Sequence, residues 1–546
     1  MSMTGNLERE LRGAIERILQ SSSRKKLVVA GPGTGKTRLF KILLEFMPGE
    51  PQRRLVLTFI NNLKLDLEQS LSDLASVFTL HGYCQSLLRR RSGLRGGLKR
   101  DFRCLPGLAS IIKTDWVYIR GGSAPAFVDL MRNLENDDRI EFYLSRGNYY
   151  NAVDFDDSVF RIHKALTKSL GQMDEYDLVL IDEYQDFNRM EATLIDILAS
   201  TNPILIAGDD DQALYSQLRG SSWEFIRQLH RAGEYEVFPL PFCLRCPQVI
   251  VDATNDIISA ARQQKRLEGR IDKPFRAYEP IKGEDSKRYP KLSLVVTSVQ
   301  RPNANYFGRY IEEAIKRISE EELKEAVENG YPAALIIGSN PYRRQVVEYL
   351  SERDYHIDTS RDKQTGLSRS DGLKILKEDS GSNLGWRVLL EIDRPSFAAM
   401  CVRVTAERGE PLVARIPEDY RNRVLEEVKT YEPATVSRIL EPKEEKGVTI
   451  KITSYEGAKG LSAQYVFVIG VHEGELPRDS RNVQDLEICK FIVGLTRTRK
   501  KCTFLCTRLA GDRKKRLSLF LRWIRPERYE LMEVNATYWK KERKSG

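Results

Sequence analysis

The chain of 546 residues is 41% hydrophobic and 30% charged, which is typical of a soluble globular protein, and its length suggests about three or four domains. Lysine plus arginine number 87 against 77 for aspartate plus glutamate, and the resulting net charge of +10 suits a polyanionic partner but equally suits simple solubility. No apolar run approaches the roughly 18 residues of a membrane span, and the start of the chain lacks the apolar core of a signal peptide, so we expect a cytoplasmic protein without membrane contact.

The first strongly patterned stretch is AGPGTGKT, between the apolar run Leu27–Val29 and a segment with helical apolar spacing, Arg38–Leu44. Strand, glycine-rich turn and helix together predict a phosphate-binding loop, because glycines let successive backbone N–H groups point at phosphate oxygens. Lys36 would reach the outer phosphates, and the Thr37 hydroxyl would hold Mg²⁺. A glycine-rich turn that binds no nucleotide is the alternative. The residues predicted to line the nucleotide are Ala30, Gly31, Pro32, Gly33, Thr34, Gly35, Lys36 and Thr37.

Apolar runs that alternate with helical patterns continue along the chain. Strands are predicted at 54–59, 178–181, 203–207, 335–338, 449–453, 465–470 and 503–506. Several of these runs end in polar residues, which predicts open parallel α/β sheets that bind ligands along one edge. We therefore expect an α/β protein with two such units, each with an inserted, mainly helical subdomain. The expected division is 1–88 and 159–240 around an insertion at 89–158, 241–385 and 447–525 around an insertion at 386–446, and a basic tail at 526–546.

Two carboxylates stand at the end of one predicted strand. Asp182 and Glu183 follow the run Leu178–Ile181, where one could hold Mg²⁺ and the other could accept a proton from an attacking water. Such a pair alone is often a solvated turn, but Lys36 and Thr37 upstream favour the catalytic interpretation.

Three side chains further along could complete a phosphate site. The Gln212 amide could orient a water or sense the outer phosphate, since it both donates and accepts hydrogen bonds. Arg245 and Arg497 could offset the negative charge that develops when a phosphoanhydride is cleaved, although either alone would be read as a surface cation.

The eight cysteines are scattered along the chain, unlike those of a secreted disulfide scaffold. Cys243 and Cys246 have the spacing of a metal-ligand pair, but no second pair lies near them, so buried free thiols are the favoured interpretation.

In chain order, AGPGTGKT, TFINN, TLHG, IDEYQD, GDDDQALY, LRCP, GAKGL and VGLTRTR resemble the motifs of the UvrD/Rep branch of superfamily 1 helicases, from Ala30 to about Arg499. The resemblance implies two RecA-like domains that clamp ATP and Mg²⁺ between them. It also implies single-stranded or tailed DNA across the top, DNA-stimulated ATP hydrolysis, 3′-to-5′ movement and a role such as DNA repair. The inserted subdomains would be the docking place for any protein partner.

The resemblance assigns roles by position in this sequence. Glu183, Gln212, Arg245 and Arg497 would act on the phosphates, Asp182 and Thr37 on the metal, and Arg38 and Gly460 would lie at the nucleotide. For His81, a packed core histidine is the alternative to a DNA contact. The residues expected to contact DNA, or to link it to the ATP site, are Thr58, Phe59, Asn61, Thr79, His81, Tyr215 and Lys459.

The chain also departs from the family pattern. Leu244 stands where the family has a Tyr that stacks on the base, and Ser462 stands where it has a Glu that binds ribose, so we expect weak discrimination among nucleotides. The family's stacking aromatic after Tyr215 is missing, which predicts a weaker grip on DNA unless Tyr215 or Trp223 substitutes. The short second insertion leaves an alternative function open, namely an ATP-switched nucleic-acid-binding regulatory subunit with little unwinding.

Overall fold

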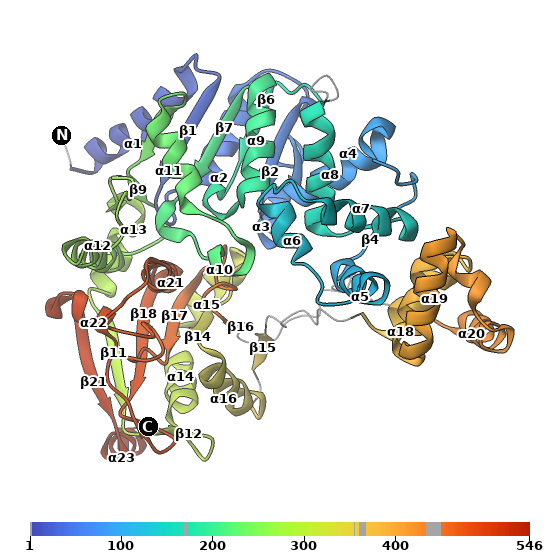
Figure 1. The fold of residues 1–546 in the computed structure, drawn as a ribbon. Helices are drawn as coiled ribbons and strands as arrows, with labels where there is room; N and C mark the ends of the chain where they lie inside the picture. Colours follow the sequence, from blue (N-terminus) through green and yellow to red (C-terminus); the bar gives the residue numbers. More distant parts are fainter. Residues whose placement is uncertain are drawn as a thin grey trace.

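Two parallel sheets, one above the other in Figure 1, form the centres of two α/β units. The computed structural model describes residues 3–59, 61–168, 173–353, 355–359, 367–432 and 449–545. The predicted α/β class is confirmed, because both sheets are entirely parallel and carry helices on both faces, as in RecA-like domains.

The first sheet has the strand order β3-β2-β6-β7-β1-β8. Its strands are β1 (Lys25–Ala30), β2 (Arg54–Thr58), β3 (Ser76–Thr79), β6 (Leu178–Ile181), β7 (Ile204–Gly208) and β8 (Glu236–Leu240). Leu27 and Val29 of β1 belong to one hydrophobic cluster and Val28 and Ala30 to another. Both faces of the strand are therefore buried, which explains why the central strands read as continuous apolar runs.

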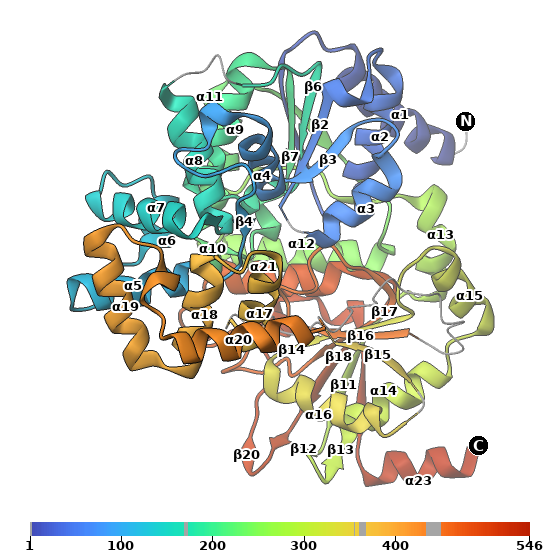
Figure 2. The same cartoon turned by 90° about the vertical axis from the view of Figure 1, so that its right-hand side faces the viewer.

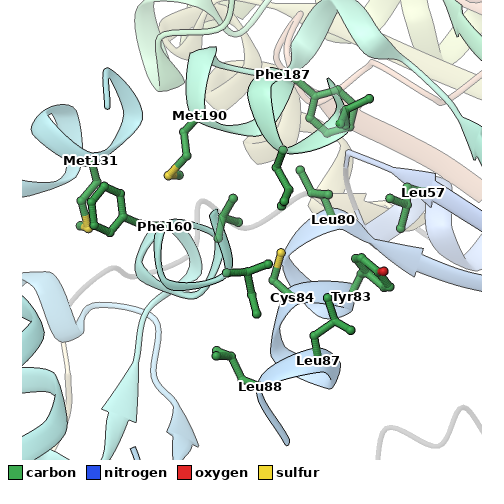
Figure 3. Packing of buried hydrophobic residues seen from close by; sticks show 14 of the residues in the cluster. Leu57, Leu80, Tyr83, Cys84, Leu87, Leu88, Met131, Phe160, Phe187 and Met190 are labelled. Carbon is green, nitrogen blue, oxygen red and sulfur yellow. The ribbon is translucent and has the colours of Figure 1, made fainter. Parts of the chain in front are cut away.

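Helices cover the two faces of this sheet. One face packs against α1 (Met3–Gln20), α2 (Lys36–Phe46) and α3 (Asn61–Leu71). The other packs against α4 (Leu80–Arg90), α8 (Phe155–Lys168), α9 (Arg189–Thr201) and α11 (Trp223–Ala232). Figure 3 shows Leu80, Cys84 and Leu87 of α4 in this core, and it shows Phe160 of α8 on the far side of its helix, beside Met131. This packing fixes the ends of β2, β3 and β6, where the predicted functional residues stand.

The second sheet has the order β15-β16-β14-β17-β18-β11-β21. Its strands are β11 (Leu292–Thr297), β14 (Ala334–Gly338), β15 (His356–Thr359), β16 (Thr449–Thr453), β17 (Ala463–Ile469), β18 (Thr498–Thr507) and β21 (Tyr529–Val534). Its main covering helices are α12 (Gln248–Gln263), α14 (Tyr306–Lys316), α16 (Asn340–Ser351), α21 (Asp485–Thr496) and α22 (Leu519–Trp523). In Figure 2, α12 and α21 lie between the two sheets, so the units meet along these helices.

The expectation of a basic tail at 526–546 was wrong. Strand β21 pairs with β11 over six residues, and helix α23 (Ala536–Ser545) follows it. Trp539 of α23 is buried in the core of the second unit. Strand β21 lies at the edge of the sheet, so only one of its sides has a partner strand. Edge strands often carry charged residues, and the charges in its sequence, YELMEV, concealed the strand in the sequence pattern.

Both units carry helical insertions. The first contains α5 (Leu108–Arg120), α6 (Phe127–Arg132) and α7 (Asp138–Tyr150). The second contains α17 (Arg369–Glu378), α18 (Asn383–Asp393), α19 (Pro395–Arg408) and α20 (Glu418–Thr430). Helix α17 packs with α18 and α20 around Trp386, so we propose that this insertion begins near 367 instead of 386. Its expected end at 446 lies outside the described residues. The other expected domain boundaries stay predictions.

The two insertions contact each other on one flank of the molecule, where α5 lies beside α18 and α19 (Figures 1 and 2). At the centre of this contact, the fully buried Asp115 of α5 accepts hydrogen bonds from Arg387 of α18 at 2.9 Å and from Arg146 of α7 at 2.8 Å. The Tyr150 hydroxyl donates to the same carboxylate at 2.6 Å. One buried carboxylate therefore pairs with two buried guanidinium groups, one from each insertion.

We predict that Asp115→Ala lowers the free energy of unfolding by about 3–5 kcal/mol. Among the described residues, the change leaves the buried Arg146 without a carboxylate partner and leaves Arg387 with only the partly exposed Glu391. Urea denaturation measures the loss. Asp272→Ala is the matched control, since the Asp272 side chain is 74% exposed and its loss from the ion pair with Arg262 should cost about 0–1 kcal/mol. Equal losses in the two variants would contradict the assignment of Asp115 as the centre of the contact.

Candidate active site

A cavity of about 580 Å³ opens between the two units, at the carboxyl edge of the first sheet. Both units contribute to its wall, and most of the predicted phosphate-binding residues line it. From the first unit come Gly31, Gly33, Thr34, Gly35, Lys36, Thr37, Asp182, Glu183 and Gln212. From the second unit come Leu244, Arg245, Tyr331, Gly460, Leu461, Ser462, Arg497 and Arg499.

The predicted phosphate loop connects β1 to α2, as its strand–turn–helix pattern requires. Gly33 and Gly35 have φ angles of +67° and +87°, which only glycine adopts freely. A Cβ atom on Gly33 would lie 2.6 Å from the Cβ atom of Arg245, so the absence of a side chain lets the second unit approach the loop. Pro32 and Ala30 are buried beside the turn.

Lys36 and Glu183 form an ion pair of 2.9 Å inside the cavity. Glu183 also lies 3.5 Å from Lys459, and the amide of Gln185 donates to it. Burial alone would raise the pKa of Glu183, but the two ammonium groups outweigh burial and lower it, so Glu183 is a carboxylate. Its φ of +54° places this non-glycine residue in the left-handed region, a local strain typical of functional sites.

Asp182 differs from its neighbour, because it has no ion-pair partner among the described residues. Burial and the adjacent charge of Glu183 raise the pKa of Asp182 to about 7. A buried carboxylate without a cation, next to the exposed Thr37 hydroxyl on the same cavity wall, is a donor set that suits Mg²⁺. These residues therefore fit the metal that the sequence predicted.

Three arginines of the second unit face the cavity, and none of them has a carboxylate partner within the part of the chain that the structure describes. Arg245 donates to the Thr496 carbonyl at 3.3 Å, Arg497 to the Gln212 side chain at 2.6 Å, and Arg499 to the Ser462 hydroxyl at 2.9 Å. Burial and the charge of Arg245 lower the pKa of Arg497 to about 9, and they lower the pKa of Arg499 as well. Guanidinium groups in such surroundings favour an anionic ligand.

Arg499 was not identified from the sequence. Its guanidinium carbon lies 4.2 Å from the centre of the Tyr331 ring. A signal was available, since the repeat Thr496-Arg497-Thr498-Arg499 puts Arg497 at the end of α21 and Arg499 at the start of β18. Arg38, by contrast, is exposed on the first turn of α2 and does not line the cavity. Gly460, with a φ of +81°, forms the turn before β17.

Gln212 ends a turn that contains three buried carboxylates. Within the described ranges, Asp209, Asp210 and Asp211 are the only group of three or more residues that could hold a metal ion. The ammonium group of Lys273 already contacts all three, at 2.7–2.9 Å. The Gln212 amide donates to Asp209 at 2.7 Å while its oxygen accepts from Arg497. This cluster therefore positions Gln212, and we assign no metal to it.

The residues expected to contact DNA gather at the edge of the first sheet, but several are covered. The Phe59 ring, which is 3% exposed, packs 5.1 Å from the Tyr215 ring and beneath the guanidinium of Arg219 at 4.7 Å. His81 is buried and contacts Arg219 at 3.0 Å and Glu191 at 3.2 Å. Sequence reasoning did not identify Arg219, which connects these side chains.

The remaining expected contact residues have structural partners or lie outside the description. Thr79 caps α4 by accepting the Gly82 N–H at 3.0 Å, and Thr58 is fully buried at the end of β2. Asn61 begins α3, and its side chain lies outside the described ones.

Lys459 is buried, contacts Asp186 and donates to the Gln212 carbonyl at 2.6 Å. Lys459 therefore connects the second unit to the cavity edge of the first.

Comparison with known proteins matches the first unit to a family. The family model described as the UvrD/REP helicase N-terminal domain matches residues 11–113 and 131–232. The chain is 24% identical over 337 residues to a probable DNA helicase II homolog of Mycoplasma capricolum, covering 53% of this chain and 45% of the relative. It is 24% identical over 285 residues to the ATP-dependent DNA helicase PcrA of Staphylococcus aureus, covering 44% and 38%.

A PcrA of Staphylococcus epidermidis is also 24% identical, over 378 residues, which cover 59% of this chain and 50% of the relative. The chain thus spans half or less of the length of these curated relatives. In the described part of the chain, no helix has the length and apolar character needed to cross a membrane.

We predict that Arg499→Gln weakens the binding of inorganic triphosphate about tenfold, because it removes one charge-assisted contact from the cavity. Isothermal titration calorimetry with the full chain measures the change. Arg481→Gln, which alters a 92% exposed arginine outside the cavity, should leave the affinity unchanged. Equal affinities for the Arg499 and Arg481 variants would show that Arg499 does not face the ligand.

Proposed function

The chain is UvrD/Rep-like, and from that premise we propose that it is an ATP-dependent DNA helicase that moves 3′ to 5′ along single-stranded DNA. The observation that carries this proposal is the shared cavity, in which Lys36 of the first unit faces three arginines of the second. These arginines have no carboxylate partner among the residues that the structure describes. A triphosphate in the cavity would supply the missing negative charge. Its hydrolysis would then change how strongly the two units hold each other.

In this proposal Lys36 leaves Glu183 and contacts the outer phosphates, which frees the Glu183 carboxylate to accept a proton from the attacking water. Gln212, held between Asp209 and Arg497, orients that water. Arg245 and Arg497 offset the charge that develops on the phosphoryl oxygens. Thr37 and Asp182 would hold Mg²⁺, which when bound neutralises phosphate charge.

A chain of contacts supports coupling between this cavity and the DNA-contacting edge. Lys459 reaches Glu183 and Asp186 on one side and the ring of Tyr215 at 5.9 Å on the other. The Tyr215 hydroxyl donates to the Glu456 carbonyl at 3.0 Å, and its ring packs against Phe59. A change in the ion pairs of Glu183 therefore has a short path to the ring that we expect to lie beside the strand.

The alternative function, an ATP-switched regulatory subunit with little unwinding, is not favoured, because the side chains to which we assign hydrolysis all line the cavity. Strand displacement on a 3′-tailed duplex separates the two functions. The helicase proposal predicts unwinding by the purified chain that requires ATP and fails on a 5′-tailed duplex. Stimulated ATPase activity without any strand displacement would favour the regulatory alternative.

We predict that Lys36→Ala lowers the DNA-stimulated ATPase rate by about a hundredfold or more, because it removes the cation that meets the transferred phosphoryl group. A coupled assay with single-stranded DNA measures the rate. Lys41→Ala is the matched control, since Lys41 lies on the same helix with a half-exposed side chain and should keep full turnover. Full turnover by the Lys36 variant, with an unchanged melting temperature, would refute the active-site assignment.

We also predict that kcat/KM for ATP exceeds that for GTP by only a small factor. Leu244 stands where the family has a stacking Tyr, and it packs against Gly35. Ser462 stands where the family has a ribose-binding Glu, and its hydroxyl accepts a hydrogen bond from Arg499. Discrimination between purines needs paired donors and acceptors. A preference of roughly a hundredfold or more would contradict this and would direct attention to the amides of Gln69 and Asn329, which line the cavity.

A further inference from the structure

We propose that Cys243 and Cys246 are a modification site, at which a peroxide closes a reversible disulfide that displaces Arg245 from the active site. The formation of the disulfide follows from the geometry of the two thiols alone. Only its effect on turnover rests on the proposed function.

The two cysteines occupy one tight turn between β9 (Phe242–Cys243) and α12. The Cys246 N–H donates to the Cys243 sulfur at 3.4 Å, and the two thiols lie close enough to hydrogen-bond to each other. The Cys246 sulfur also donates to the Thr496 carbonyl at 3.5 Å. Both sulfurs therefore lie on the same side of the turn, as a disulfide requires.

The surroundings of Cys243 favour its thiolate. Burial would raise its pKa, but hydrogen bonds from the Cys246 thiol and from the N–H groups of Cys246 and Arg245, together with the Arg245 charge, lower it to about 7. The pKa of every other cysteine is raised, mainly by burial. A thiolate beside a thiol is the combination that forms a disulfide most readily.

Metal binding explains the pair less well. Zinc needs about four protein ligands in a structural site. In the part of the chain that the structure describes, the only group of three or more possible ligands is the aspartate trio that Lys273 neutralises, and it does not include these cysteines. The pair therefore offers two sulfurs and no third ligand, which suits oxidation better than coordination.

The redox step is balanced with a peroxide as the oxidant. The Cys243 thiolate attacks one peroxide oxygen, the O–O bond breaks, and a sulfenic acid forms while hydroxide leaves and takes up a proton. The Cys246 sulfur then attacks the Cys243 sulfur, the S–O bond breaks, and a second water leaves with the Cys246 proton. Overall, two thiols lose two electrons and two protons, and one hydrogen peroxide becomes two waters. Hydrogen peroxide is close to water in size, so it suits a site this enclosed.

The disulfide would act on Arg245 because this residue lies between the two cysteines. The turn contacts the predicted phosphate loop directly. The Leu244 N–H donates to the Gly33 carbonyl at 2.8 Å, and the Arg245 Cβ atom leaves no space for a side chain on Gly33. Drawing the sulfurs to about 2.05 Å would pull Cys246 from the Thr496 carbonyl, which also anchors the Arg245 guanidinium. Arg245 would then lose the position from which it faces the cavity.

The test treats the full chain with increasing hydrogen peroxide, alkylates the remaining thiols after denaturation, and maps the peptides by mass spectrometry. The proposal predicts a Cys243–Cys246 disulfide before any oxidation of Cys104, although Cys104 is the one cysteine that is not buried. Oxidation of Cys104 while the pair stays reduced would overturn the proposal. Because this readout needs no activity, it decides the disulfide even if the proposed function fails.

ATPase activity tests the consequence. Oxidation should lower turnover about a hundredfold or more, and dithiothreitol should restore it, as expected for the loss of an arginine contact to phosphate. Cys246→Ser should keep basal turnover and resist peroxide, whereas Cys104→Ser should stay sensitive. If Cys246→Ser does not fold, Cys243→Ser takes its place. A mapped disulfide with unchanged turnover would contradict the displacement of Arg245.

Discussion

The structure depends on a charge imbalance across one cleft. On one wall, Lys36 and Glu183 form an ion pair, while Asp182 beside them has no ion-pair partner among the described residues. On the facing wall, Arg245, Arg497 and Arg499 have only neutral oxygens as hydrogen-bond partners in the described part of the chain. Buried charges without counter-charges are costly, so an anionic ligand that completes this arrangement would stabilise it. A magnesium-bound triphosphate has the charge and the oxygen atoms to do so.

The architecture explains how residues so distant in sequence meet there. In a parallel sheet, all strands end at one edge, so the loops after β1, β6 and β7 of the first unit converge. The second unit reaches the same place through α21, which carries Arg497 at its end, and through the turn after β9, which carries Arg245. Lys459 then ties the two units together at Asp186 and Gln212. Relative movement of the units would therefore act directly on the side chains that line the cavity.

Local signals in the sequence predicted the parts of the site that form within one strand and its following turn. The predicted phosphate loop and the Asp182–Glu183 pair could be named from the sequence because their residues are neighbours. The structure brings them into one cavity with Gln212, Arg245 and Arg497. Strand β21 and the ion network of Lys273 were missed, because each is defined by partners far away in sequence. The burial of Phe59 under Arg219 also escaped prediction, since a motif does not report which neighbour covers a ring.

A crystal structure with a non-hydrolysable ATP analogue and Mg²⁺ tests the central claim most directly. We expect Lys36 to leave Glu183 for the outer phosphates, and we expect Arg245 and Arg497 to move from Thr496 and Gln212 onto the same phosphates. A bound analogue with Lys36 still paired to Glu183, and with both arginines still on their present partners, would contradict the claim.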